Sequence, residues 1–166
     1  AKKLQNSNSR VKFVICGDGE NFTNLKLQTK KLKNILLTGW ISESYLRVLM
    51  QRSDIGLAPY IQSKSFYSAM GNKPSEYLSG KLPIALSLEK GETFNIINKY
   101  ECGFSYKNNS QILYEKLIYL KNNPLYLKKI SNNAFNTFKH FFDANIVYGK
   151  MINYLSDISE SKLKYE

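Results

Sequence analysis

The residues of this chain with the clearest chemical potential lie within one short stretch: Gly71, Asn72, Lys73 and Glu76. Pro74 is favourable in the first turn of a helix, so we expect a helix from about Pro74 to Ser79 that stops at Gly80. A short apolar strand should follow. A loop, a helix N-terminus and a strand end directed at one place are the parts of a phosphate-binding crevice in an open α/β sheet.

Glu76 and Lys73 each allow two interpretations. Glu76 can simply stabilise the N-terminal end of its helix, a contribution of roughly 0.3 to 1 kcal/mol. Alternatively, its carboxylate can accept hydrogen bonds from two ligand hydroxyls, as acidic residues in nucleotide sites do with ribose. Lys73 can be a solvated surface lysine or a phosphate ligand. The neighbouring glycine and asparagine, and the aromatic Tyr60, Phe66 and Tyr67 just before them, favour the ligand-binding interpretation.

Other candidate motifs carry less information. The GDGE sequence at residues 17–20 resembles half of a dinucleotide fingerprint, and it fits either a plain tight turn or a loop whose amides face a ligand. His140 is the only histidine, and no Ser, Cys or Asp pattern makes it the base of a catalytic triad. No cluster of His, Cys or acidic residues has metal-ligand spacing, so no metal and no cofactor are expected.

Length and composition indicate a single soluble domain. A chain of 166 residues can bury about two thirds of its unfolded surface without disulfides. Cys16 and Cys102 have no redox or metal spacing and are interpreted as reduced core thiols. No apolar run reaches roughly 18 residues and no signal peptide is recognised, which predicts a cytoplasmic location.

The chain is strongly basic, with a net charge of +11. Residues 1–34 alone carry eight Lys or Arg residues but only two acidic ones, Asp18 and Glu20. Arginine is scarce and basic runs are not interleaved with aromatic residues, so nucleic acid is not the expected partner. Peripheral contact with an anionic membrane, at the inner membrane face, or binding of a polyphosphate ligand remains open.

Five short apolar runs have the character of strands, and helical patterns separate them. The strands are expected at residues 11–16, 35–38, 55–58, 83–87 and 102–106. This alternation predicts an α/β fold, a Rossmann-like parallel sheet of five or six strands with helices on both faces. After residue 107 the pattern is helical, with Ser110 expected as a cap and Pro124 opening another helix. We therefore expect a Rossmann-like domain at residues 1–140 and a C-terminal helix at residues 141–166.

Five consecutive segments together resemble a known enzyme family. They are VICGDGE, NILLTGW, LMQRSDIGLAPY, GNKPSEYLSGKLPIALS and KGETFNIINKYECGFSY. In order and spacing they are similar to the donor-binding half of retaining nucleotide-sugar glycosyltransferases with the GT-B fold, of the group 1 type. The NKPSEY string looks most like the bacterial capsule and lipopolysaccharide enzymes of this family.

The resemblance implies a role for each matching residue. Glu76 corresponds to the second glutamate of the family's E-x7-E motif, which holds the ribose hydroxyls. No catalytic residue is assigned, and Ser68 stands where the first glutamate of that motif would be. The remaining implied donor contacts are the loop facing the interdomain cleft (Gly17, Gly19), the turn beside the base (Gly39, Trp40, Ile41), the distal-phosphate loop (Gly71, Asn72, Lys73) and the turn over the sugar phosphate (Gly91, Glu92, Thr93).

The resemblance also implies a function and a partner. The chain would be the donor-binding half of a hexosyltransferase that transfers a sugar from a nucleotide-diphosphate sugar to a glycan or lipid-linked acceptor in surface polysaccharide synthesis. The acceptor-binding N-terminal domain is not represented in this sequence, so we expect this chain to be inactive alone. Two alternatives remain: half of a GT-B sugar-nucleotide epimerase, and a non-catalytic basic α/β module that binds anionic lipid or nucleic acid.

Overall fold

The five expected strands are present. The computed structural model describes residues 1–7, 9–68 and 70–163, with side chains described as far as residue 159. Each strand lies within two residues of its expected bounds. They are β1 (Phe13–Cys16), β2 (Ile35–Gly39), β3 (Gly56–Ala58), β4 (Ile84–Leu86) and β5 (Gly103–Ser105).

The strands are parallel, as predicted, but they form two sheets instead of one. β1 pairs with β2, and β3, β4 and β5 form a second sheet in that order. Within the described residues, no strand pair joins the two sheets. The predicted α/β fold with parallel strands and flanking helices is confirmed, and the difference is that the strands form two sheets. Apolar runs in the sequence reveal strands, but which strand pairs with which depends on contacts between distant parts of the chain.

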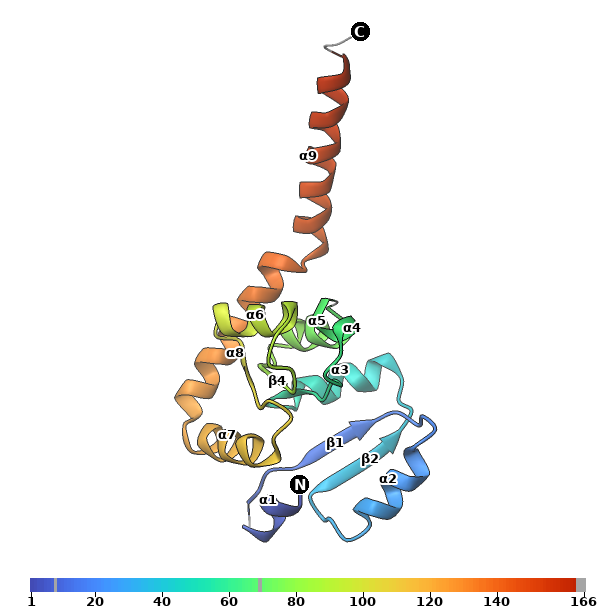
Figure 1. Ribbon diagram of the computed structural model, residues 1–166, viewed down its shortest axis with the longest axis vertical. Helices are drawn as coiled ribbons and strands as arrows, with labels where there is room; N and C mark the ends of the chain where they lie inside the picture. The colour runs from blue at the N-terminus through green and yellow to red at the C-terminus, as the bar shows by residue number, and fades with distance from the viewer. Residues whose placement is uncertain (8, 69, 164–166) are drawn as a thin grey trace.

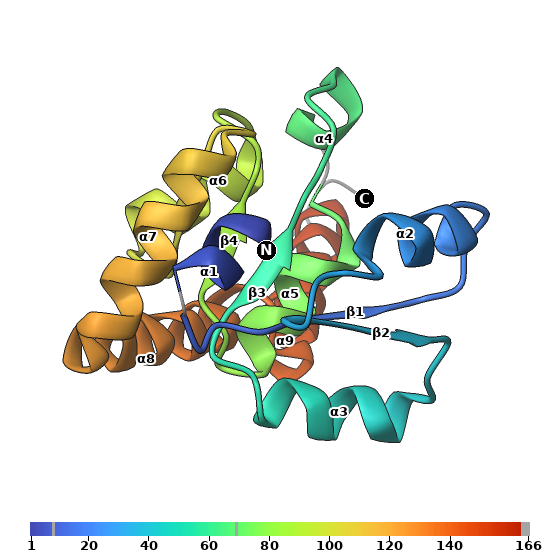
Figure 2. The same cartoon turned by 90° about the horizontal axis from the view of Figure 1, so that it is seen from below.

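Helices connect and cover the strands (Figures 1 and 2). The helices before β4 are α1 (Lys2–Asn6), α2 (Phe22–Thr29), α3 (Glu43–Gln51), α4 (Lys64–Ser68) and α5 (Asn72–Ser79). Those after it are α6 (Glu92–Lys99), α7 (Ser110–Asn122), α8 (Pro124–Phe141) and α9 (Ala144–Leu163). The cap of α7 is Asn109 and not the expected Ser110: its side-chain oxygen accepts from the N–H groups of Gln111 and Ile112 at 2.8 and 3.3 Å.

The core is built around β4. Every residue from 82 to 88 is at most 4% exposed. A strand with a neighbour on each side and helices on both faces has no solvent side, which explains why its apolar run is continuous and not alternating. Leu78 of α5, Ile97 of α6 and Ala134 of α8 complete this core, each with no exposed surface.

The β1–β2 sheet is less well covered. Side chains of β1 alternate between half-buried and exposed, and Cys16 is exposed at its end. The prediction of two core thiols was correct for Cys102, which is buried, and wrong for Cys16. Val14 and Leu36 are register partners on this sheet and are 39% and 58% exposed, so its uncovered face is apolar.

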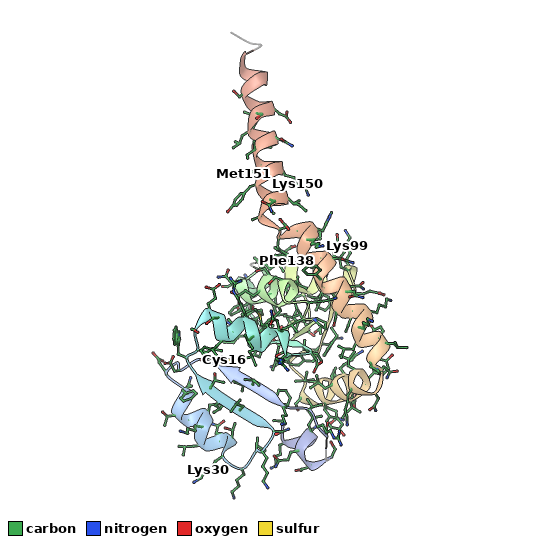
Figure 3. All side chains as sticks on the ribbon, turned by 180° about the vertical axis from the view of Figure 1, so that it is seen from behind. Cys16, Lys30, Lys99, Phe138, Lys150 and Met151 are labelled. Carbon is green, nitrogen blue, oxygen red and sulfur yellow. The ribbon has the colours of Figure 1, made fainter. Side chains whose placement is uncertain are left out.

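The last helix, α9, leaves the body of the protein. It begins after a break at Phe142 and Asp143 and rises away from the other elements (Figure 1). In Figure 3 the side chains of Lys150 and Met151 stand out from α9 with no other element beside them. Residues 164–166 of the expected tail lie outside the described residues. No helix formed by the described part of the chain combines the length and apolar character that a membrane span requires.

The burial of β4 leads to a stability prediction. Leu86→Ala removes a fully buried side chain and should lower the free energy of unfolding by about 2 to 5 kcal/mol. Leu36→Ala makes the same change on an exposed position of β2 and should cost less than about 1 kcal/mol. Urea denaturation followed by circular dichroism measures both. Equal losses in the two variants would contradict the placement of the core around β4.

Candidate functional site

The stretch from Gly71 to Glu76 lies at the carboxyl end of β3. α5 begins at Asn72, two residues before the expected start, and Gly71 is its N-cap residue. No side chain caps this helix, so the first N–H groups of α5 are available to a ligand, and the helix dipole favours an anion there. Pro74 is buried in the first turn. Asn72 and Lys73 are exposed in front of it.

Glu76 is exposed one turn into α5, and its surroundings are aromatic. Tyr60 follows β3, and its pKa is raised by burial and then by the negative charge of Glu76. Burial, followed by Tyr60 and Glu76, raises the pKa of Tyr77 to about 12. Among the described residues no cation or hydrogen-bond donor engages the Glu76 carboxylate. Glu76 is therefore a carboxylate without an internal partner, held beside two tyrosines.

An aromatic pair borders the same region. The rings of Tyr60 and Phe66 stack with centroids 4.8 Å apart and planes inclined by 16°. Phe66 belongs to α4, which stands out from the body beyond β3 (Figure 2), and Phe66 is 36% exposed. Ser68, at the position of the first family glutamate, ends α4 and is exposed. Ring stacking therefore connects α4 to the segment that follows β3.

α4 is also tied to the start of α6. The Tyr67 hydroxyl donates to the Gln62 side-chain oxygen at 3.0 Å, and the Gln62 amide donates to the Ser87 carbonyl at 2.7 Å. The ammonium group of Lys90 lies 4.8 Å from the centre of the Tyr67 ring. Gly91 has a φ of +100°, and a Cβ there would lie 2.5 Å from the carbonyl oxygen of Tyr67. Glycine at position 91 therefore permits the close contact of α4 with α6.

The remaining turn residues have different environments. Gly91 is the N-cap residue of α6, and Glu92 in its first turn is exposed. Thr93, however, is 1% exposed. The Thr93 side chain belongs to the core, so in this turn the backbone and the Glu92 side chain are the parts that can face a ligand.

A separate group lies at the carboxyl ends of β1 and β2. The Gly17 N–H donates to the Gly39 carbonyl at 2.7 Å, and the two residues have φ values of +120° and +69°. Trp40, directly after them, is 72% exposed, and Ile41 is half-buried. Gly19 is exposed and open on the side where a Cβ would stand.

The fold brings these groups toward one edge of the molecule. Cys16, the last residue of β1, is among the groups that raise the pKa of Tyr77, so the end of β1 lies near Tyr77 of α5. The sequence indicated Tyr60 as part of this region, but it gave Cys16 and Tyr77 no role in the site. The glycine at position 56 was the signal in the sequence for its contact with Tyr77, because a glycine inside a strand often marks the close approach of another group.

The expected site residues line neither of two hollows of about 240 Å³ in the structure. One hollow is lined by residues of β5, α7 and α8, the other mainly by residues before β1 and β2. Within the part of the chain that is described, no group of three or more His, Cys, Asp or Glu side chains could hold a metal ion. The chemistry that this surface offers is therefore anion binding by N–H groups and Lys73, and acceptance of hydroxyl hydrogen bonds by Glu76.

Comparison with known families agrees with this geometry. The model of the family "Glycosyl transferases group 1" matches residues 1–137. The chain belongs to this family. The match covers every strand and ends within α8, so α9 lies outside it. A search of curated proteins finds no match. The α/β architecture with parallel strands is consistent with a Rossmann-like half of a glycosyltransferase of the GT-B type.

The contact between Gly91 and Tyr67 gives a prediction for this glycosyltransferase domain. Gly91→Ala should lower the free energy of unfolding by about 1 to 3 kcal/mol, because the new methyl group meets the Tyr67 backbone at a φ that disfavours alanine. Hydrogen exchange of the Tyr67 amide, which donates to Ser63, should accelerate as α4 separates from α6. Gly19→Ala is the matched control and should stay within about 0.5 kcal/mol of the original protein. Unchanged exchange at Tyr67 in Gly91→Ala would refute the coupling of α4 to α6.

Proposed function

We propose that this chain is the donor-binding half of its glycosyltransferase and holds a nucleotide-diphosphate sugar at the carboxyl ends of its strands. The observation that carries this proposal is the Glu76 carboxylate, which has no partner among the described residues and lies beside a helix N-terminus without a side-chain cap. A carboxylate that accepts two hydroxyls and a cluster of N–H groups that accepts phosphate are complementary to the two polar parts of a nucleoside diphosphate.

In this proposal the ribose binds at Glu76. The carboxylate is exposed and has no cation to neutralise it among the described residues, so it can accept the 2′- and 3′-hydroxyls as charge-assisted hydrogen bonds. The nearby hydroxyl of Tyr60 limits the direction from which the sugar approaches. The base extends toward the β1–β2 end, where exposed Trp40 and the Gly17–Gly39 turn form the adjoining surface.

The diphosphate faces the start of α5. Gly71, Asn72 and Lys73 supply uncapped N–H groups, the positive end of the helix dipole and one ammonium group. Negative charge grows on the diphosphate as the bond to the transferred sugar breaks, so groups already in place lower the energy of that transition state. Ser68 and the Gly91–Glu92 turn lie on the α4–α6 side, where the transferred sugar would be.

The acceptor side of the reaction requires a second domain. The helix α9 follows α8 in the chain, rises away from the other elements and carries exposed apolar side chains, among them Val147, Met151 and Leu155. We place the acceptor-binding domain against this helix and opposite the N-terminal end of α5. The acceptor is then a glycan or lipid-linked sugar of surface polysaccharide synthesis, and catalysis needs both domains.

The role of Glu76 is tested by Glu76→Gln. This change should weaken binding of a ribonucleoside diphosphate by about 1.5 to 3 kcal/mol, the range for hydrogen bonds to a charged group, and leave the melting temperature nearly unchanged. Calorimetric titration with ribo- and 2′-deoxyribonucleoside diphosphates measures it, and Trp40, the only tryptophan, gives an independent fluorescence signal. Loss of the 2′-hydroxyl should weaken binding to the original protein and have little effect on the variant.

Glu115→Gln provides the matched control, since Glu115 is an exposed helical glutamate on α7, and its affinity should equal that of the original protein. Equal binding of ribo- and deoxyribonucleotides by the original protein, with no loss in Glu76→Gln, would refute the donor-site assignment. Glu76 would then be a surface carboxylate that only supports the N-terminal end of α5.

A second candidate partner is an anionic membrane surface, favoured by the basic edge of the molecule. Arg10, Lys12 and Lys33 are distant from the donor site and line one hollow at the amino ends of β1 and β2. This is the end of those strands opposite to Gly17 and Gly39, so donor and membrane can bind together. Such contact would keep the enzyme beside lipid-linked acceptors.

Binding to vesicles tests this role directly. Sedimentation with vesicles containing anionic lipid should retain the protein at low salt, and raising the salt should release it because exposed charges are screened. The triple change of Arg10, Lys12 and Lys33 to Gln should reduce the bound fraction while nucleotide affinity stays constant. Binding that is equal on neutral vesicles, or insensitive to the triple change, would contradict the assignment of this edge.

A further inference from the structure

Gly56 of β3 has no side chain, and the ring of Tyr77 in α5 fills the space that this leaves, which we call the Gly56 notch. A Cβ built on Gly56 would overlap the Tyr77 ring and lie 2.9 Å from the Tyr77 Cβ. The backbone of Gly56 does not have the positive φ that calls for glycine. Space for the tyrosine is therefore the reason that β3 has no side chain at this position.

The Tyr77 hydroxyl makes a second tie to the same strand. It donates to the Leu57 carbonyl at 3.1 Å. Gly56 and Ala58 direct their backbone groups toward β4, since the Gly56 N–H donates to Pro83 and the Ala58 carbonyl accepts from Ser87. Successive peptide groups of a strand alternate in direction, so the Leu57 carbonyl faces the other edge of β3, where no strand pairs with it among the described residues. Tyr77 thus satisfies a carbonyl on an open edge.

These two contacts determine how α5 is rotated. Pro74 and Leu78 form its buried side, and Tyr77 is held in the Gly56 notch beside them. Successive helix residues point about 100° apart, so fixing Tyr77 also fixes the direction of Glu76. Glu76 is thereby turned out of the core and toward Tyr60, where its carboxylate is exposed.

We infer that Tyr77 is the positioning residue of Glu76: its ring in the Gly56 notch and its hydroxyl on the Leu57 carbonyl hold the carboxylate where it accepts the ribose hydroxyls. This inference rests on the proposed donor site and adds a specific supporting residue to it. Tyr77 does not touch the ligand. Its effect on binding passes through Glu76 alone.

The test is a double-mutant cycle of Tyr77→Phe with Glu76→Gln, measured by calorimetry with ribo- and 2′-deoxyribonucleoside diphosphates. Tyr77→Phe keeps the ring and removes one neutral hydrogen bond, so ribonucleotide affinity should fall roughly 2- to 10-fold. The preference for ribo- over deoxyribonucleotide should fall with it. In the Glu76→Gln background the same change should alter affinity by less than about 2-fold, since the group being positioned is gone.

Two further variants separate positioning from general stability. Tyr100→Phe removes a hydroxyl from a half-buried tyrosine at the end of α6 and should leave affinity and sugar preference unchanged. Gly56→Ala should displace the Tyr77 ring and reduce the ribose preference like Tyr77→Phe. In a Tyr77→Ala background the ring is absent and only the contact with the Cβ of residue 77 remains, so Gly56→Ala should lower thermal stability less than it does in the original protein.

These variants distinguish a failure of the positioning role of Tyr77 from a failure of the donor site at Glu76. If Glu76→Gln weakens ribonucleotide binding but Tyr77→Phe does not, the positioning role is overturned and the donor site stands. The positioning role is also overturned if Tyr77→Phe lowers nucleotide affinity equally in both backgrounds and leaves the ribose preference intact. Tyr77 would then have a purely structural role. If Glu76→Gln itself binds like the original protein, the donor-site proposal fails and the role of Tyr77 fails with it.

Discussion

Burial of the strand β4 is the constraint on which the rest of the structure depends. Its three residues have no exposed surface, and the flanking residues from 82 to 88 are nearly as buried. A strand in this position must have its backbone groups paired on both edges, and β3 and β5 supply that pairing in parallel register. Because each parallel connection returns over a face of the sheet, α5, which leads into β4, and α6, which leads out of it, both have their N-terminal ends on the carboxyl side of the strands.

Close contacts at glycines then set the distances between these elements. The Tyr77 ring lies against Gly56, the Tyr67 backbone against Gly91, and the Ile84 backbone against Gly103. Each contact joins a strand or a helix end to a neighbour at a distance that any side chain would prevent. The first two contacts determine the geometry of the candidate site. The contact of Tyr77 with Gly56 orients α5, and the contact of Tyr67 with Gly91 holds α4 against the start of α6.

The polar chemistry of the site depends on what is left unpaired. The charged pairs in the described residues are exposed and join Arg47 to Glu43 within α3 and Lys129 of α8 to Glu101 in the turn after α6. Glu76 and Lys73 are not used in this way, and α5 has no side-chain cap. Where a surface leaves a carboxylate, an ammonium group and helix N–H groups free at one place, it is suited to a ligand that carries both hydroxyls and phosphates. Membership of the group 1 glycosyltransferases is consistent with such a ligand.

Local sequence determined the elements of this protein, and tertiary contacts decided how they meet. Apolar runs bounded by glycine and proline were enough to place all five strands, and the NKPSEY string was enough to place a helix start with Glu76 in it, because both signals act over a few neighbouring residues. The division into two sheets, the exposure of Cys16, the burial of Thr93 and the helix at 64–68 could not be predicted in this way. Each depends on which distant segment covers a given face. The link between Gly56 and Tyr77 has the same origin: 21 positions separate the two residues in the chain, and only the packing of α5 on β3 makes them neighbours.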